Sequence, residues 1–401
     1  MTLVTTRRAL RAYLVTATLS RSATESAGPA VLVGTIATVG SATSGSYVVA
    51  SLTASAAVAG PVVGALIDRA RSPRLGFAAA MLVMAIGLSV IAFLLGDVPL
   101  WWIMAIAVVA GLGYPALTGA WSAQIPKLVS PGTLTRAYSA DAVTYSLAAV
   151  VAPPAATALV GVAATGPIWL AVVVLAIAAV TLRAVPLPRR EAVGTRPHLV
   201  HDLRDGLVAM LRRAGLRRST VITTVGFAGQ AAVFVAAPVL ATELGQSLGF
   251  TGFILGSFAI GGVTTAAWFA RRPVQRPDRA IIVSTLLSGL ALMAIGLAPT
   301  PALLLLAAFA MGATEPPLVS AMFQVRVRES PSHVQAQVFS TSASLRMTAF
   351  AVATAACGWL VGGPGIAAAI AFGVALHVIA LAAGLLTGPS LPKREKWLRR
   401  R

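Results

Sequence analysis

Apolar stretches of about 20 residues run through almost the whole chain and are separated by short polar or basic segments. A helix of that length crosses the ~30 Å hydrocarbon core of a bilayer. Within the bilayer each backbone donor and acceptor must be paired inside the segment, which a helix achieves. The composition agrees, because 57% of the 401 residues are hydrophobic and only 11% are charged, against about a quarter charged in an ordinary soluble protein. The sequence therefore predicts an all-α integral membrane protein.

The apolar stretches fall into two groups of six. The first group covers approximately 13–39, 43–67, 75–96, 100–125, 137–161 and 166–187, and the second approximately 219–243, 251–270, 280–298, 301–325, 334–361 and 365–388. We therefore expect 12 transmembrane helices in two six-helix halves: an N-terminal bundle over 1–187, a linker over 188–218, and a C-terminal bundle with a basic tail over 219–401. Leucines four residues apart alternate with charged residues in the linker, which predicts an amphipathic helix on the membrane surface.

Lysine and arginine occupy alternate loops. Of the 31 basic residues, 29 lie in the N-terminal segment, the linker, the tail or every second loop, while the intervening loops have none. By the positive-inside rule the basic segments face the cytoplasm, so both termini are expected there. The formal net charge of +19 then reflects topology rather than nucleic-acid binding. The abundance of Ala, Gly, Val and Arg indicates a GC-rich bacterial genome, which predicts a multi-pass protein of the plasma (inner) membrane.

One predicted hairpin carries a motif. The apolar run before it stops at Asp68, and the spacing Gly64-x3-Asp68-Arg69 ends the second predicted span. In a chain of two six-span halves this spacing resembles the hairpin between helices 2 and 3 of the major facilitator superfamily. Arg71-Ser72-Pro73-Arg74 here replaces the glycine that usually separates its basic residues. The resemblance implies a monomeric secondary transporter of small molecules, with alternating access between two halves and no cofactor.

Asp68 is expected to meet the start of the eleventh span, where Ser332 is a predicted N-cap and unpaired backbone N–H groups favour an anion. Gly64, Asp68, Arg69 and Ser332 would then form a conformational latch, which holds the basic side closed while the transporter faces outward. The corresponding hairpin of the second half, after Gly262, has no acid matching Asp68.

Five ionisable residues inside the predicted spans are candidates for proton or substrate binding: Arg21, Glu25, Asp141, Glu315 and Arg346. A charge at that depth costs at least ~2.5–3.5 kcal/mol on insertion scales, so it is rarely kept without a role. Arg21 and Glu25 are four residues apart and share a helical face. Glu25 is therefore half of an intrahelical ion pair, or a carboxylate that binds a proton or a cationic substrate, and the two roles are compatible.

Asp141, Glu315 and Arg346 each have two interpretations as well. Asp141, near the start of the fifth span, is either a paired or solvated helix-start acid or a functional one. Glu315 precedes two prolines, which remove backbone donors and predict a break in the tenth span beside the acid. It is either a substrate or proton site or the partner of Arg346, which in turn either holds Glu315 ionised or attracts an anionic substrate. His377, in the last span, is expected to be a hydrogen-bonded packing residue.

Two spans depart from patterns of proton-antiporting exporters in the same superfamily. The fifth span keeps small residues and Pro153 but has Ala148, Ala152 and Ala156 where the resembling pattern has glycine. Close packing of this span is therefore expected to survive. The fourth span has Val108 in place of an arginine. Aromatic candidates for lining a central cavity are Tyr114, Trp121, Tyr138, Tyr145, Phe227, Phe234 and Phe323.

The sequence contains no phosphate-binding loop of the G-x4-G-K-[ST] type, no cluster of metal ligands and no nucleophile–base set. An enzyme and a metal site are therefore not expected. The leading hypothesis is an antiporter for proton-coupled efflux of small amphipathic compounds, since few Asn or Gln residues lie inside the spans. One alternative is a proton-coupled importer or a facilitator of a small anionic metabolite, centred on Arg21 and Arg346. Another is a transport-inactive membrane scaffold.

Overall fold

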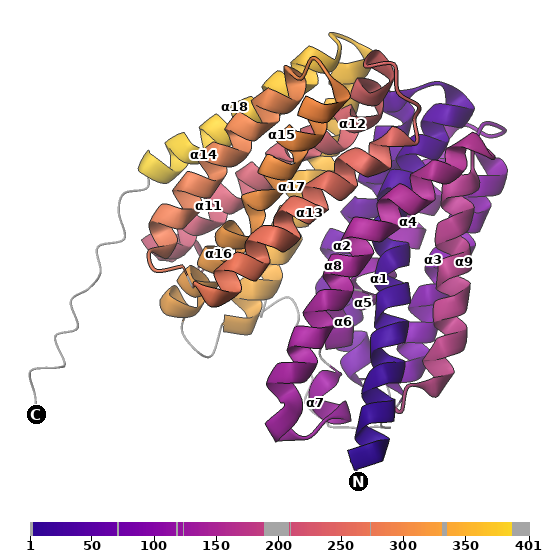
Figure 1. Cartoon of the computed structure of the whole chain (residues 1–401), viewed down its shortest axis with the longest axis vertical. Helices are drawn as coiled ribbons and strands as arrows, with labels where there is room; N and C mark the ends of the chain where they lie inside the picture. Colours follow the sequence, from indigo (N-terminus) through magenta and orange to yellow (C-terminus); the bar gives the residue numbers. More distant parts are fainter. Residues whose placement is uncertain are drawn as a thin grey trace, which may run out of the picture.

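The chain is built from helices (Figure 1). The computed structural model describes residues 3–69, 72–117, 119–122, 124–187, 208, 210–272, 274–330 and 335–386, and every regular element in these ranges is helical. Most of the predicted linker, from 188 to 207, lies outside them. The predicted amphipathic linker helix and the boundaries of the two halves therefore stay predictions.

The first half of the chain forms the six predicted spans, the fourth of them from more than one helix. Its elements are α1 (Leu3–Val39), α2 (Ala42–Arg69), α3 (Pro73–Leu94), α4 (Leu100–Gly111), α5 (Tyr114–Leu117), α6 (Gly119–Ser122), α7 (Ile125–Leu128), α8 (Leu134–Ala158) and α9 (Gly166–Thr181), with short 3-10 turns at Pro131–Thr133, Leu159–Gly161 and Leu182–Ala184. The helix α1 begins ahead of the predicted first span and continues through Pro29.

The second half repeats this arrangement. Its elements are α11 (Ala214–Gly229), α12 (Ala231–Glu243), α13 (Phe250–Arg271), α14 (Pro277–Gly296), α15 (Pro301–Ala313), α16 (Glu315–Glu329), α17 (Gln335–Gly362) and α18 (Ile366–Leu386). Several of them start with proline in the first turn, where its missing N–H costs nothing. In α15 the hydroxyl of the N-cap Thr300 also accepts a hydrogen bond from the backbone N–H of Leu303.

Three spans are broken. The predicted break beside Glu315 is confirmed, because α15 ends at Ala313 and α16 begins at Glu315 with a proline in its first turn. Two further breaks were not predicted. One separates α4 from α5 at Leu112 and Gly113, and the other separates α11 from α12 at Gln230.

The helices are suited to a membrane. Among the described residues, nine helices are long and apolar enough to cross one, judged by length and composition. The long helices α1 and α2 and the broken helix that starts with α4 occupy the other three predicted positions. The structure is thus consistent with the expected twelve crossings.

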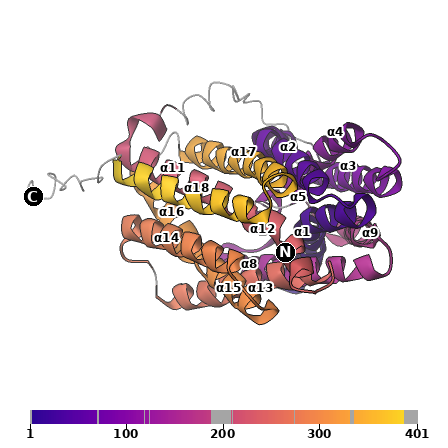
Figure 2. The ribbon, with the colours of Figure 1, turned by 90° about the horizontal axis from the view of Figure 1, so that it is seen from above.

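The two halves pack as separate bundles, each with its own apolar core. Buried Phe77, Met84 and Trp121 belong to the core of the first half, and Leu292, Leu304 and Met311 to that of the second. Between the bundles, α2 packs against α17 and α8 against α13, as Figure 2 also shows. In Figure 1 the bundles converge at the end opposite the N-terminus and diverge toward it.

We name the two ends of the molecule by their charge. At the basic end, helices begin or finish near Arg8, Arg74, Arg136, Arg213 and Arg271. At the neutral end, the loops 40–41, 95–99, 162–165, 244–249, 297–300 and 363–365 carry no lysine or arginine.

Tight turns close the neutral end. Gly245, with φ at 71°, follows α12, and its N–H bonds Thr242 while the N–H of Gln246 bonds Ala241. This is a Schellman turn, which favours glycine because the left-handed conformation strains a side chain.

Candidate functional site

A cavity of about 180 Å³ lies between the two bundles. Both halves line it. From the first half come Thr24, Glu25, Gly28, Pro29, Val49, Leu52, Thr53 and Tyr114, and from the second Phe227, Phe234, Met347 and Phe350. The wall is mainly apolar and aromatic, as in sites that bind small organic ligands. The prediction that Tyr114, Phe227 and Phe234 line a cavity is confirmed.

Three phenylalanine rings of the second bundle form the wall of the cavity that faces α1. The ring centroids of Phe227 and Phe350 lie 5.2 Å apart, and those of Phe234 and Phe350 lie 6.2 Å apart. Gly28 lets this wall approach α1, because a Cβ at that position would lie 3.1 Å from the ring of Phe234. The aromatic wall therefore sits one helical turn beyond Glu25.

Glu25 is the one ionisable carboxyl group on the wall of this cavity. Its side chain is partly exposed, and within the described residues it makes no hydrogen bond and no ion pair. An ionised carboxylate in such apolar surroundings is costly unless it gains a partner. The geometry thus leaves this carboxyl group free for a proton or for a cation that enters the cavity.

Arg21, one turn before Glu25, has a different partner. Its guanidinium is fully buried and lies against Asp141 of α8, with Nη1 2.7 Å from Oδ1 and Nη2 3.2 Å from Oδ2. The interpretation that Arg21 pairs with Glu25 is corrected accordingly: in the described structure its ion pair is with Asp141. The partner lies 120 residues away, which helix periodicity cannot reveal.

The Arg21–Asp141 pair is enclosed by hydrogen bonds. Asp141 accepts from the hydroxyls of Tyr13 and Ser122, each at 2.6 Å. Arg21 donates to Thr144 and, at 3.1 Å, to Ser122, and its guanidinium lies 3.6 Å from the ring centroid of Tyr145. These bonds satisfy the carboxylate and the two terminal nitrogens of the guanidinium, while the Nε of Arg21 stays buried without an acceptor in the described structure. Partners of this kind are what a buried charge pair needs to be tolerated. Of the interpretations of Asp141, the paired helix acid is the one that the geometry bears out, and the acid is buried rather than solvated.

Glu315 and Arg346 lie in the second bundle and do not line the cavity described above. The carboxylate of Glu315 accepts a hydrogen bond from the amide of Gln230, which sits at the break between α11 and α12. Arg346 contacts the sulfur of Met322 at 3.6 Å and lies over Phe227, with its guanidinium carbon 4.3 Å from the ring centroid. Between Glu315 and Arg346, both described, no ion pair within 4 Å forms, but the two charges attract each other at longer range. That Arg346 holds Glu315 ionised therefore stays a prediction.

Of the remaining predicted residues, the structure describes the side chain of His377 but not those of the latch. His377 bonds the carbonyl of Gly373 at 2.8 Å and the hydroxyl of Ser288 at 3.2 Å, which confirms a packing role. The side chains of Gly64, Asp68 and Arg69 lie outside the described residues, as does Ser332. The latch therefore stays a prediction.

Close packing joins the bundles at the neutral end. Thr43 at the start of α2 donates to the carbonyl of Gly358 at 2.7 Å, and Thr157 at the end of α8 donates to that of Gly249 at 3.0 Å. A Cβ at Gly252 would overlap Thr157 and Pro154. The expected close packing of the fifth span is thus found, with α13 supplying the glycines.

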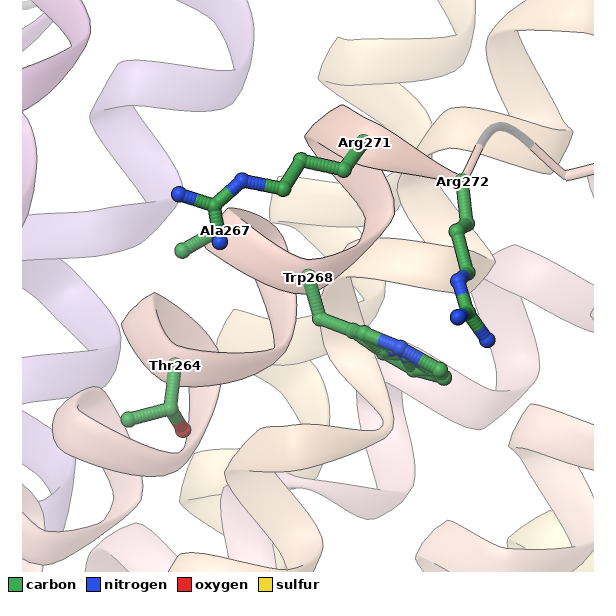
Figure 3. Close-up of a pocket in the computed structure, with 5 residues that line it drawn as sticks. All are labelled: Thr264, Ala267, Trp268, Arg271 and Arg272. Atoms are coloured by element: carbon green, nitrogen blue, oxygen red, sulfur yellow. The ribbon is translucent and has the colours of Figure 1, made fainter.

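A second hollow, of about 560 Å³, opens at the basic end of α13. Figure 3 shows Arg271 and Arg272 extending on either side of Trp268. The guanidinium carbon of Arg272 lies 5.1 Å from the Trp268 ring centroid. Tryptophan and arginine together are typical of membrane–water boundaries, and the hollow is separate from the Glu25 cavity.

Two functional candidates escaped the sequence reasoning. Arg326, which was assigned to a basic loop, is only 2% exposed inside α16. The apolar residues Leu318, Met322 and Val325 recur at helical spacing, and extending this spacing by one turn places Arg326 on the same buried face. Gln230 donates the hydrogen bond to Glu315. Its one signal in the sequence is that a single amide side chain stands within an otherwise apolar span.

Comparison with known proteins fixes the family. A model of the Major Facilitator Superfamily matches residues 13–277, about two thirds of the chain. The chain belongs to the major facilitator superfamily. Membership in this family makes it a membrane transporter and not an enzyme, as predicted.

Relatives of known name match only part of the chain. It is 27% identical over 178 residues to Macrolide efflux protein A of Streptococcus pyogenes, covering 42% of this chain and 43% of that protein. The same identity holds for Macrolide efflux protein A of Enterococcus faecalis, of which 54% is covered. The match thus spans about half the length of these relatives or less.

Solved structures share the whole fold. The nucleoside transporter NupG superimposes with a TM-score of 0.76 at 13% identity, over 95% of this chain and 100% of that one. A POT family transporter in complex with a thioalcohol-conjugated peptide gives 0.73 at 12% identity, over 94% and 95%. At such identities the likeness speaks for the fold alone, and it confirms the predicted major facilitator fold.

Proposed function

We propose that this transporter exports small amphipathic compounds in exchange for protons. The observation that carries the proposal is Glu25, a carboxyl group without a partner in the described structure, on the wall of an aromatic cavity shared by both bundles. An acid in that position binds either a proton or a cationic ligand, and competition between the two couples their movements. The partial match to macrolide efflux proteins supports the outward direction.

The cavity wall supports the substrate class. The faces of Phe227, Phe234 and Phe350 suit an apolar body and attract a cationic head. The volume of about 180 Å³ is below the ~300–1,000 Å³ of typical ligand pockets. Small ligands fit as the cavity stands, and larger ones require the bundles to separate further.

The remaining charged residues have other roles in this proposal. The ion pair of Arg21 and Asp141 holds α1 against α8 and so positions Glu25. Glu315 accepts a hydrogen bond from Gln230 and so stabilises the break in the seventh span. The basic loops support a location in the plasma membrane with both termini in the cytoplasm.

A facilitator of anionic metabolites is less well supported. Its cations would have to face the cavity, whereas Arg21 is engaged with Asp141 and Arg346 lies behind Phe227.

The experiment is transport into proteoliposomes with an acidic interior, using tetraphenylphosphonium and erythromycin as probes. Proton antiport predicts uptake that follows the pH gradient and stops when an ionophore collapses it. Glu25→Gln should lower gradient-driven uptake at least about 10-fold, as expected for the loss of an essential proton carrier. The control is Asp278, an acid at the basic end that is partly exposed and paired with Arg328, and Asp278→Asn should transport normally.

Three outcomes would contradict the proposal. Uptake that ignores the pH gradient would indicate a facilitator. Uptake driven by an alkaline interior would indicate a proton-coupled importer. A Glu25→Gln variant with full coupled flux would remove Glu25 from the mechanism.

A further inference from the structure

Two arginines in the second bundle have buried N–H donors without hydrogen-bond partners among the described residues. Arg326 of α16 is 2% exposed, and its Nε and Nη2 meet no hydrogen-bond acceptor in the described structure. The Nε of Arg346 on α17 is also buried without an acceptor. The contacts of these guanidinium groups are apolar: Phe339 lies 5.7 Å from Arg326, and Phe227 and Met322 lie beside Arg346.

These contacts bring three helix faces together. Arg346 reaches from α17 to Met322 on α16 and to Phe227 on α11, while Arg326 reaches from α16 to Phe339 on α17. On both α16 and α17 the arginine and the residue that the other arginine contacts lie on the same helical face. Phe339 and Arg346 are seven apart on α17, and Met322 and Arg326 are four apart on α16.

Hydroxyl groups without partners continue the same faces. On α11, Thr224 and Thr220 lie three and seven residues before Phe227, and the Oγ1 of each is buried without a hydrogen bond in the described structure. Ser330, one turn after Arg326, has a buried unpaired Oγ as well. We call Thr220, Thr224, Arg326, Ser330 and Arg346 the basic-end cluster.

The cluster contains only positive charge and hydroxyls. Of the nearby carboxylates, Glu329 pairs with Arg328 at 3.0 Å, and Glu315 bonds Gln230 and attracts Arg346 without reaching it as an ion pair. Within the described residues Arg326 has no carboxylate acting on it and is repelled by Arg346. Leaving a buried charge unpaired is strongly unfavourable. Arg21 makes the contrast in charge rather than in every donor: its Nε is also unpaired in the described part of the chain, but its two terminal nitrogens meet a carboxylate and two hydroxyls.

We propose that the basic-end cluster is a binding site for a small oxyanion, a phosphate or carboxylate group, held by Arg326 and Arg346 and by the hydroxyls of Thr220, Thr224 and Ser330. Guanidinium groups bind such oxygens through two parallel N–H donors, and hydroxyls satisfy the remaining lone pairs. The site is separate from Glu25 and independent of the direction or coupling of transport. Its ligand is either a free solute or the headgroup of an anionic lipid.

The first test measures thermal unfolding of the purified protein in an uncharged detergent. Sodium sulfate or phosphate is added to a sodium chloride buffer at constant ionic strength. A ligand of the folded state should raise the Tm in a saturable way, by about 3 °C or more. Arg326→Met should abolish the rise, and Arg326→Lys should weaken it because the paired donors are lost.

Controls separate the site from general salt effects. Arg271→Met and Arg272→Met remove exposed arginines at the same end (Figure 3) and should keep the full rise. In chloride alone, Arg326→Met should unfold at or above the wild-type Tm, since it removes an unpaired buried charge at similar volume. The proposal is overturned if sulfate and phosphate leave the wild type unchanged, or if Arg326→Met shows the same rise.

The second test identifies the source of the oxyanion. The protein is placed in nanodiscs of phosphatidylcholine with or without phosphatidylglycerol. If phosphatidylglycerol raises the Tm of the wild type but not of Arg326→Met, and removes the response to sulfate, the ligand is a lipid headgroup. If only the soluble anions act, it is a free solute. If neither arm distinguishes wild type from Arg326→Met, no oxyanion site exists there.

Discussion

Breaking the Arg21–Asp141 pair should cost more stability than any exposed ion pair in the described structure. The pair is buried, and Asp141→Asn would leave the guanidinium inside the bundle with only hydroxyl and carbonyl acceptors. Removing one partner of a buried pair typically costs about 3–5 kcal/mol. Arg21→Met should fall at the lower limit of that range, because the hydroxyls of Tyr13 and Ser122 still donate to the carboxylate.

The double variant should recover much of the loss. With Arg21→Met and Asp141→Asn together, no unpaired charge remains inside, and the total cost should fall well below the sum of the single costs. A coupling energy of roughly 2–3 kcal/mol is expected, since interacting buried neighbours reach that size. At about 2 °C per kcal/mol for a large chain, the single variants should lose roughly 6–10 °C in Tm.

The assay is thermal unfolding in detergent, followed by tryptophan fluorescence, which reports on the buried Trp121 beside Tyr13. The matched control is Arg328→Met, which breaks a pair with Asp278 of similar length, 3.0 Å, but with the side chains 43% and 35% exposed. Exposed pairs contribute about 0–1 kcal/mol, so the control should lose at most ~2 °C. Single variants that match this control, or a double variant whose loss equals the sum, would refute the reasoning.

The remaining predictions concern close contacts. In Gly252→Ala the added methyl group would overlap Pro154 and Thr157, so spin labels at Ala163, after α8, and Gln246, before α13, should move apart. The control Gly132→Ala places its methyl group in open space and should leave this distance unchanged. An unchanged distance in Gly252→Ala would refute the close contact. In Gly111→Ala the new Cβ would overlap the carbonyl of Leu52 and the hydroxyl of Ser55 within the first bundle. The free energy of unfolding should fall by about 1–3 kcal/mol, measured by thermal unfolding. A fall under about 0.5 kcal/mol would count against this packing. Gln230→Leu removes the hydrogen bond to Glu315 and should cost ~1–3 kcal/mol, while Glu315→Gln in the same background should restore part of it. No restoration would mean that the cost is steric.

The sequence predicted the spans well because their signal is local. A run of about 20 apolar residues has one favourable state in a bilayer, and the observed helices follow the predicted ranges closely. The break before Pro316 was also local, since proline removes a donor wherever it stands. The break after Gly111 has the same local signal, since Pro115 is the second residue of α5 as Pro316 is of α16. The break at Gln230 has no such residue and depends on neighbouring helices.

Pairing of charges was not predictable in the same way. Arg21 had one candidate partner within its own helix, and the helical period favoured Glu25. The structure gave it Asp141, because α1 packs along α8 and the distance in sequence is irrelevant once two helices touch. Glu25 was recognised as a candidate from its depth alone. That it faces an aromatic cavity without a partner required the second bundle, which supplies Phe227, Phe234 and Phe350.

The two bundles treat buried arginine in opposite ways, and this difference bears on how they move. In the first bundle the charge of Arg21 is neutralised by a residue of the same bundle, so α1 and α8 are joined whatever the ligand state. In the second, as far as the structure describes it, Arg326 lies beside an aromatic ring, and Arg346 lies over another ring and donates only to the weak thioether acceptor of Met322. Phe227 has Arg346 on one side and lines the Glu25 cavity. A rearrangement of Arg346 therefore displaces a wall of the cavity, whereas a movement of α1 away from α8 must first break a buried ion pair. On these contacts the second bundle is the more adaptable partner, and the first is the rigid unit that carries the acid.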